Sequence, residues 1–222
     1  SVWAPMPLDE QRGLIYLPTS TPTSDYYGGN RPGANLFAES LVCLDAATGK
    51  VKWHFQTVHH GLWDWDIPTQ PNLVTITVDG KRIDAVAQVT KRGDTFVFDR
   101  VTGVPVWPIV ERPVPQGGVP GEKLSPTQPF PTNPKPLQFQ GYSEDMLIDF
   151  TPELKAQAVE IMKSYNKGPL YTPLDEVKPG MRGTLINPGY GGGANWNGAG
   201  VDPGTNIMYV RIPTKPSPAG LA

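Results

Sequence analysis

The side chains most capable of chemistry are concentrated in residues 57–68, TVHHGLWDWDIP, which contain two histidines, two tryptophans and two aspartates. This stretch follows an apolar, strand-like run, and loops at strand ends are where a rigid scaffold usually carries functional groups. Asp64 and Asp66 are the first candidates, because a positioned carboxylate can accept a proton from a reacting group. The alternative is that the tryptophans fill a core and the aspartates only cap a turn.

The adjacent histidines of the same stretch, His59 and His60, raise the question of a metal site, because paired histidines can ligate zinc or copper. Neighbouring residues of an extended chain point to opposite sides. No third ligand is spaced to join the two histidines. We therefore expect them to line a substrate pocket or to support the residues around it.

The composition limits the class of protein. The 222 residues include 19 basic and 21 acidic side chains, for a formal charge of −2, which gives no surface for a polyanion and argues against nucleic acid as a partner. Proline (26) and glycine (24) are abundant while hydrophobic residues still reach 38%, which indicates many turns around a true core.

The chain has one cysteine, Cys43, so an internal disulfide is excluded and a buried, inert thiol is expected. No apolar run approaches the roughly 20 residues that a membrane-spanning helix needs, and the N-terminus has no basic and apolar leader. Both ends resemble cuts from a longer protein. We expect a soluble segment whose membrane contacts, if it has any, come only from other parts of that protein.

Two kinds of turn recur along the chain. An Asp-led hairpin turn occurs at 9–17, DEQRGLIYL, and again at 202–210, DPGTNIMYV. A second turn occurs at 45–53, DAATGKVKW, and again at 99–107, DRVTGVPVW, with Asp, Thr, Gly and Trp at matching offsets. The spacing of the second pair falls in the range of propeller or solenoid repeats.

One hairpin of each kind makes a unit of four antiparallel strands, which is the composition of a propeller blade. We therefore predict an all-β fold, a partial β-propeller of four-stranded antiparallel blades with a proline-rich, one-helix insertion. Trp53 and Trp107 are expected to pack between neighbouring blades. The predicted parts are a blade at 1–56, a site loop at 57–71, a blade at 72–110, the insertion at 111–185 and a partial blade at 186–222.

The insertion breaks the repeat. Its first part, 111–136, is so rich in proline that we expect it to run extended over the surface. The run at 151–166, TPELKAQAVEIMKSYN, predicts one amphipathic helix, with Thr151 as its N-cap and Pro152 at its first position. We expect this helix to lie over a rim of the propeller.

Three longer motifs carry a family resemblance. RPGANLFAESLVCLDAATGKVKWHFQTVHHGLWDWDIPTQP, VTKRGDTFVFDRVTG and RPVPQGGVPGEKLSPTQPFP resemble the quinoprotein dehydrogenases that use pyrroloquinoline quinone (PQQ). The chain is most similar to the branch that contains the membrane-bound glucose dehydrogenases. The resemblance implies an eight-bladed propeller with the quinone and a calcium ion on its axis, of which this chain is about two and a half blades.

The resemblance also implies roles for particular residues. Asp64, in LWDWD, matches the catalytic aspartate that takes the proton of the substrate hydroxyl beside the calcium ion. Lys91, in VTKRG, matches a basic residue that hydrogen-bonds the quinone oxygens, and Asn195 and Trp196, in GGANWNG, match a pair placed against the cofactor. The predicted blades support this, since Asp64 follows the last strand of one unit and Lys91 ends the first hairpin of the next.

Two positions depart from the family pattern. Thr21 stands where relatives often carry a calcium-binding asparagine, and its hydroxyl or carbonyl oxygen would also suit calcium. Gly61 stands where relatives commonly carry an acid, which would alter the contacts with the substrate.

The implied function is PQQ-dependent oxidation of an alcohol or aldose sugar in the periplasm, with Asp64 as the base, calcium polarising the quinone, and a respiratory quinone or cytochrome accepting the electrons. The alternative is a non-enzymatic propeller scaffold of the outer-membrane assembly type, since such proteins share the same repeats. Asp64, Lys91 and Asn195 together distinguish the two, because a scaffold has no need of all three.

Overall fold

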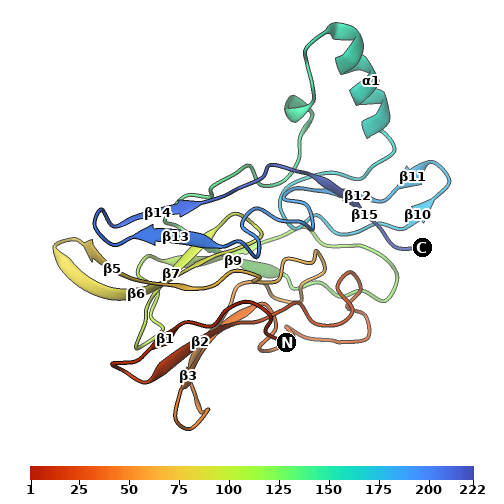
Figure 1. Ribbon diagram of the computed structural model, residues 1–222. Coiled ribbons are helices and arrows are strands. Elements are labelled where there is room, and N and C mark those ends of the chain that lie inside the picture. The colour runs from red at the N-terminus through yellow and green to blue at the C-terminus, as the bar shows by residue number, and fades with distance from the viewer.

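The structure, a computed structural model, describes residues 1–222 as antiparallel strands with a single α-helix (Figure 1). The helix is α1 (Pro152–Met162), and one 3₁₀ turn covers Glu144–Met146. The strands are β1 (Leu8–Asp9), β2 (Leu14–Pro18), β3 (Ser40–Asp45), β4 (Val51–Gln56), β5 (Asn72–Val78), β6 (Lys81–Val89), β7 (Thr95–Asp99), β8 (Ile109–Pro113), β9 (Thr127–Pro131), β10 (Val177–Lys178), β11 (Met181–Arg182), β12 (Thr184–Ile186), β13 (Ala199–Asp202), β14 (Ile207–Val210) and β15 (Ser217–Ala219).

The first sheet has four antiparallel strands in the order β1-β2-β3-β4, the composition predicted for the first unit. Alternating residues of β2 are buried, as expected for a strand with one face on a core. The turn between β3 and β4 is held by Asp45, whose Oδ1 accepts hydrogen bonds from Thr48 N (2.9 Å) and Oγ1 (2.8 Å). The chain then passes through Gly49, whose φ of +69° suits glycine.

The second sheet, β5-β6-β7, begins with the predicted hairpin at Asp79 and Gly80, where both residues have positive φ, as a type I′ turn requires. The prediction of four strands in this unit was wrong. After β7 only a single bridge forms, between Phe98 and Pro105, because prolines in the run VPVWP lack the N–H groups that a fourth strand needs.

The proline-rich part of the insertion also differs from the prediction of a purely extended segment. β8 pairs with β9 in a hairpin whose register runs from Ile109 opposite Pro131 to Pro113 opposite Thr127. Gln128 on β9 is 1% exposed, so the hairpin contributes to the interior. Its prolines are tolerated because the two strands form a separate two-stranded sheet, in which each strand has a free edge.

The first two sheets share one apolar cluster, and Trp53 lies between them as predicted. The indole contacts Phe98 at 5.8 Å between ring centroids and donates to the backbone oxygen of Arg100 at 3.2 Å. Cys43 is fully buried in the same cluster, and burial raises the pKa of its thiol to about 11. The expectation of a buried, unreactive thiol is therefore confirmed.

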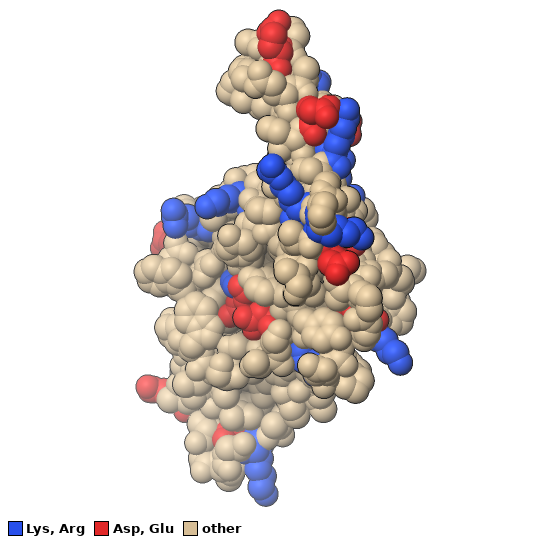
Figure 2. Space-filling model, turned by 90° about the vertical axis from the view of Figure 1, so that its right-hand side faces the viewer, with Lys and Arg blue, Asp and Glu red and all other residues tan.

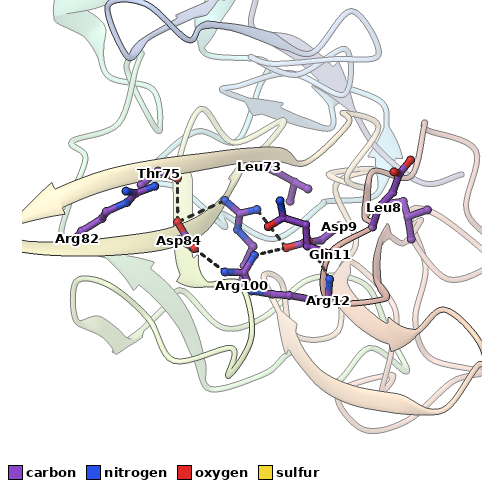
Figure 3. Close-up of a pocket in the computed structure, with 10 residues that line it drawn as sticks. Leu8, Asp9, Gln11, Arg12, Leu73, Thr75, Arg82, Asp84 and Arg100 are labelled. Atoms are coloured by element: carbon purple, nitrogen blue, oxygen red, sulfur yellow. Dashed lines mark hydrogen bonds and ion pairs between the residues drawn. The ribbon is translucent and has the colours of Figure 1, made fainter.

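A charged network closes the outer end of this contact (Figure 3). Asp9 pairs with Arg12 at 2.9 Å and with Arg100 at 3.2 Å, and Arg12 also reaches Asp84 at 2.6 Å. The residues line a cleft of about 400 Å³ between the β1–β2 hairpin and the second sheet. The network joins the two sheets, so we assign the cleft a structural role.

The hairpin β13–β14 begins the third predicted unit, and it packs beside β5. Asn206 occupies its turn with a φ of +58° and donates to Thr75 O on β5 at 2.9 Å. Trp107 and Met208 pack with the apolar residues of the second sheet on this side. Trp107 therefore lies between units as expected, while the domain boundaries themselves stay a prediction.

The predicted helix is present, with Thr151 as its N-cap and Pro152 in its first turn. The expectation that it lies over a rim was wrong, since α1 projects away from the strands (Figures 1 and 2). Of its residues only Met162 is buried, while Ile161 is 57% exposed. The helix buries too little apolar surface to pack on the strands, and the segment is joined to the neighbouring β10–β11 hairpin only after the helix, where Arg182 N donates to Ser164 O at 2.7 Å. No helix of this chain is both long enough and apolar enough to span a membrane.

Candidate active site

The blade arrangement predicted that Asp64 and Lys91 lie at one rim, and in the structure their side chains are in contact. Lys91 Nζ donates to the backbone oxygen of Asp64 at 2.8 Å and lies 3.4 Å from its carboxylate Oδ1. Asp64 lies in the loop after β4, and Lys91 lies in the turn between β6 and β7. Two strand ends from different sheets therefore bring a carboxylate and an ammonium group together.

Asp66 completes this group. Its Oδ1 lies 2.5 Å from Lys91 Nζ, and its Oδ2 accepts a hydrogen bond from Trp3 Nε1 at 2.8 Å. Asp66 is 4% exposed and Lys91 is 5% exposed, so the pair is shielded from solvent. A shielded ammonium held between two carboxylates keeps a fixed direction, whereas an exposed lysine side chain can rotate freely.

Asp64 is the more accessible of the two acids, with 27% of its side chain exposed. Burial raises the pKa of Asp64 to about 6; the charge of Lys91 lowers it and that of Asp66 raises it further. A carboxylate with this pKa is still mostly ionised at neutral pH and is a stronger base than an ordinary aspartate. Its φ of +55° is uncommon outside glycine and is held by the contacts of the loop.

The tryptophans of LWDWD have the structural role that was the alternative for this stretch. Trp63 and Trp65 are each 1% exposed and stack at 5.3 Å, with the edge of Tyr171 against both. Trp63 Nε1 donates to Thr172 O at 2.8 Å, so the ring is also anchored by hydrogen bonding. The aspartates do not cap a turn, since both face Lys91.

The glycine-rich loop that precedes Asn195 and Trp196 lies against Lys91. Gly193 N donates to Lys91 O at 2.6 Å, and a Cβ on Gly192 would lie 2.3 Å from Lys91 Cγ. The side chains of Asn195 and Trp196 do not contact the aspartates: the Asn195 amide bonds within its own turn, to Gly191 O at 2.6 Å, and Trp196 is 71% exposed. The backbone of the glycine-rich loop therefore contacts the site, while the indole of Trp196 is exposed to solvent.

Glu39 is a residue of this region that sequence reasoning missed. It is fully buried, its Oε1 accepts a hydrogen bond from Thr21 Oγ1 at 3.3 Å, and its Oε2 has no partner. Burial raises the pKa of Glu39 to about 8, against the lowering effect of Arg31. In the sequence it appears only as a polar residue at the start of a strand.

The sequence feature that could have pointed to Glu39 is Gly61, because a glycine stands there in place of the acid expected from the family resemblance. A Cβ built on Gly61 would lie 1.9 Å from Glu39 Oε2, so the glutamate carboxyl occupies the space that a side chain at position 61 would fill. An acid is therefore present at this place, supplied by the residue just before β3 instead of by the loop.

In the structure no group of three or more His, Cys, Asp or Glu side chains comes together around His59 and His60. Each histidine pairs with a glutamate of the proline-rich segment.

Figure 2 shows that acidic side chains of the molecule gather in a hollow in the middle of one face, while basic ones lie mainly around it.

Comparison with known proteins identifies the family to which this fold belongs. Residues 1–220 match the family described as "PQQ: Glucose/ethanol/alcohol dehydrogenase, beta-propeller domain". The chain belongs to this family, and the predicted all-β, partial propeller fold is confirmed.

Two relatives illustrate the degree of similarity within this family. The quinoprotein glucose dehydrogenase of Escherichia coli (strain K12) is 38% identical over 211 residues, which are 94% of this chain and 26% of that protein. The glycerol dehydrogenase large subunit of Gluconobacter oxydans (strain 621H) is 38% identical over 212 residues, 94% of this chain and 28% of that protein. The chain therefore spans about a quarter of the length of these relatives.

Solved structures agree at the level of the fold. A europium-containing methanol dehydrogenase matches with a TM-score of 0.62 at 20% identity, over 95% of this chain and 29% of the other. The quinohemoprotein alcohol dehydrogenase of Comamonas testosteroni matches with a TM-score of 0.60 at 21% identity, over 97% and 26%.

Proposed function

We propose that the protein containing this chain oxidises an alcohol or an aldose sugar with PQQ, with Asp64 as the catalytic base. The observation that supports this most directly is the contact between Lys91 Nζ and Asp64, 2.8 Å from the backbone oxygen and 3.4 Å from the carboxylate. A base and a positive charge in contact are what the oxidation of a hydroxyl group by a quinone requires.

The residues fit the proposed cofactor and cation. Lys91 is a shielded ammonium that suits an oxygen gaining negative charge, and Trp196 offers an open aromatic face for a planar ring. The carboxylate of Asp64 and the hydroxyl of Thr21 are hard oxygen donors of the kind calcium prefers. Glu39 accepts a hydrogen bond from Thr21 through Oε1, while its buried Oε2 has no hydrogen-bond partner. This oxygen is a further acceptor that a cation beside Thr21 would satisfy. We propose Asp64 and Thr21 as calcium ligands and Lys91, Asn195 and Trp196 as contacts of the quinone.

In the proposed reaction Asp64 takes the proton of the substrate hydroxyl as the C–H bond breaks. When bound, the quinone supplies the two-electron acceptor and calcium supplies the Lewis acid that polarises it. Lys91 then serves two purposes: its ammonium stabilises negative charge that develops on a bound oxygen, and its bond to the Asp64 backbone keeps the base in place. The proton that Asp64 accepts leaves through its exposed side.

The setting of the reaction follows from the family alone. We propose a periplasmic location and a respiratory quinone or cytochrome as the electron acceptor. The substrate class, an alcohol or sugar, is supported by relatives named as glucose and glycerol dehydrogenases.

The test uses the intact protein that contains this chain. It is purified, stripped of metal with a chelator and of quinone by dialysis, and assayed for dye-linked oxidation of glucose, glycerol and ethanol. We expect turnover only when PQQ and calcium are both restored. Full activity without either would contradict the proposal, and absence of quinone binding would favour the scaffold alternative.

A further inference from the structure

The two adjacent histidines of the site loop each pair with a glutamate of the same proline-rich segment, but in different surroundings. His59 Nε2 lies 3.0 Å from Glu111 Oε1, with side chains 24% and 48% exposed. His60 Nε2 lies 2.7 Å from Glu122 Oε1, and both side chains are 2% exposed. The second pair is therefore a shielded bridge between the site loop and the insertion.

Every polar atom of the buried pair has a partner. His60 Nδ1 donates to Gly33 O at 2.7 Å. Glu122 Oε2 accepts from Gly28 N at 2.7 Å, and its Oε1 also accepts from Lys123 N at 3.1 Å. Since Nδ1 faces a carbonyl oxygen, it carries a hydrogen, and one further proton must lie between Nε2 and Oε1. Removing either side chain leaves the other buried and unpaired, which is costly.

The backbone around the His60–Glu122 pair is also closely packed against it. A Cβ built on Gly28 would lie 2.3 Å from His60 Nε2, so the backbone of the 28–35 segment runs directly against the imidazole. His60 N also donates to Ala34 O of this segment at 3.1 Å. Three parts of the chain, the site loop, the 28–35 segment and the insertion, therefore meet at one histidine.

This meeting point lies four residues before the proposed base. His60 and Asp64 both have positive φ, +49° and +55°, a region that His and Asp enter more readily than most residues but that contacts of the loop must still hold. The carbonyl of Gly61, between them, accepts a bond from Arg31 Nη2 at 2.7 Å. The direction of the Asp64 backbone is thus determined at its N-terminal side by the His60 contacts and at Asp64 itself by Lys91.

We propose that His60 and Glu122 are positioning residues that hold the loop bearing Asp64 in its reactive geometry, with the proline-rich insertion as their anchor. The proposal rests on the proposed function for its effect on turnover, but its effect on the loop is independent of that function. Displacement of a catalytic group by about 1 Å can cost on the order of a hundredfold in rate.

The test compares Glu122→Ala, Glu122→Gln and Glu111→Ala in the intact protein. We expect Glu122→Ala to lower kcat by about a hundredfold per quinone-loaded site while KM changes little, because the base moves and the substrate contacts remain. Glu122→Gln should recover most of the loss, since its amide can donate to His60 Nε2 and accept from Gly28 N, giving up only the bond from Lys123 N. Glu111→Ala, the exposed counterpart, should leave kcat unchanged.

Amide hydrogen exchange of residues 57–68 supplies a second readout that needs no activity. Exchange should become faster in Glu122→Ala and stay as in the parent for Glu111→Ala. Unchanged exchange together with unchanged kcat in Glu122→Ala would overturn the proposal. If the parent shows no turnover while Glu122→Ala still loosens the loop, the proposed function fails and the positioning role stands. If Glu122→Ala does not fold, Glu122→Asp, which is one methylene shorter, replaces it, and normal kcat and exchange in that variant would likewise refute the role.

Discussion

Lys91 donates to the backbone oxygen of Asp64 at 2.8 Å, so the lysine determines where this aspartate lies as well as how it is charged. The same ammonium lies 3.4 Å from the Asp64 carboxylate. A single side chain thus links the position of the proposed base to its pKa.

Asp64→Asn tests the base directly. The change keeps the volume of the side chain and removes the proton acceptor, so turnover should fall by about a hundredfold to ten-thousandfold. The fold should be retained, because burial disfavours the charge of Asp64 and raises its pKa to about 6, so the neutral amide removes an unfavourable charge at pH 7. Turnover and thermal unfolding are measured with Asp79→Asn, an exposed turn residue, as the control. Near-normal turnover in folded, quinone-loaded Asp64→Asn would show that the assignment is wrong.

The pKa of Asp64 also predicts the pH dependence of the reaction. A base must be ionised, so kcat/KM should decline as the pH falls through the pKa of Asp64, which bound calcium would hold below the value of about 6 that applies without the metal. Lys91 lowers the pKa of Asp64. Lys91→Ala should therefore move this decline to higher pH, besides lowering turnover and weakening quinone binding. A pH profile of kcat/KM for the parent and the variant checks the sign, and a shift to lower pH would exclude Asp64 as the titrating base.

Gly61→Ala tests the place of Glu39. The added methyl would overlap the Glu39 carboxyl, since a Cβ at position 61 lies 1.9 Å from Oε2. Overpacking of this kind costs about 1 to 3 kcal/mol of unfolding free energy. Glu39→Ala in the same chain should relieve the overlap, so the double variant should be more stable than the two separate effects predict. Simple additivity in denaturant unfolding of the four proteins would argue against the contact.

The charged network of Asp9 and Asp84 predicts how the sheet contact responds to acid. Burial raises the pKa of Asp9, but hydrogen bonds and charges of Arg12 and Arg100 outweigh it, so the pKa lies below its usual value. The pKa of Asp84 is also lowered, first by its hydrogen bond from Thr75. A lowered pKa stabilises the fold above the unfolded pKa of an aspartate, about 3.9, and this stabilisation is lost as the pH falls below it.

Asp9→Asn should therefore lower the stability at pH 7 and make the loss of stability below pH 4 less steep. Thermal unfolding between pH 7 and pH 3 measures both, with the exposed Asp149→Asn as the control. A variant with the same pH dependence as the parent would show that the network contributes nothing.

The repeated turns allowed the sheets to be predicted, because the Asp, Thr and Gly of DxxTG form the turn through contacts among themselves. Such contacts can be inferred from a short stretch of sequence. In both copies the aspartate Oδ1 accepts from the threonine N–H and hydroxyl, and the glycine has positive φ. The blade arrangement predicted only that Asp64 and Lys91 lie at one rim; their contact, between residues 27 positions apart, was not predicted.

Features that depend on distant contacts were not predictable from sequence. Glu39 and Gly61 are far apart in the chain, and only the fold shows that one carboxyl fills the space beside the other residue. Nothing in the helical pattern of 151–166 indicates whether a neighbour covers its apolar side. The pairing of His60 with Glu122 likewise joins a loop to a segment that proline content alone describes as extended.

Trp53→Ala tests the contact between the first two sheets. The ring is 9% exposed, contacts Tyr16 and Phe98, and donates to Arg100 O, so its removal leaves a cavity that the two sheets cannot fill without moving. We expect a loss of about 3 to 5 kcal/mol in the free energy of unfolding. Trp196→Ala removes the same ring from a site where it is 71% exposed and should leave this free energy nearly unchanged. Denaturant unfolding of both variants in the intact protein makes the comparison, and equal losses for the two would show that Trp53 does not pack between the sheets.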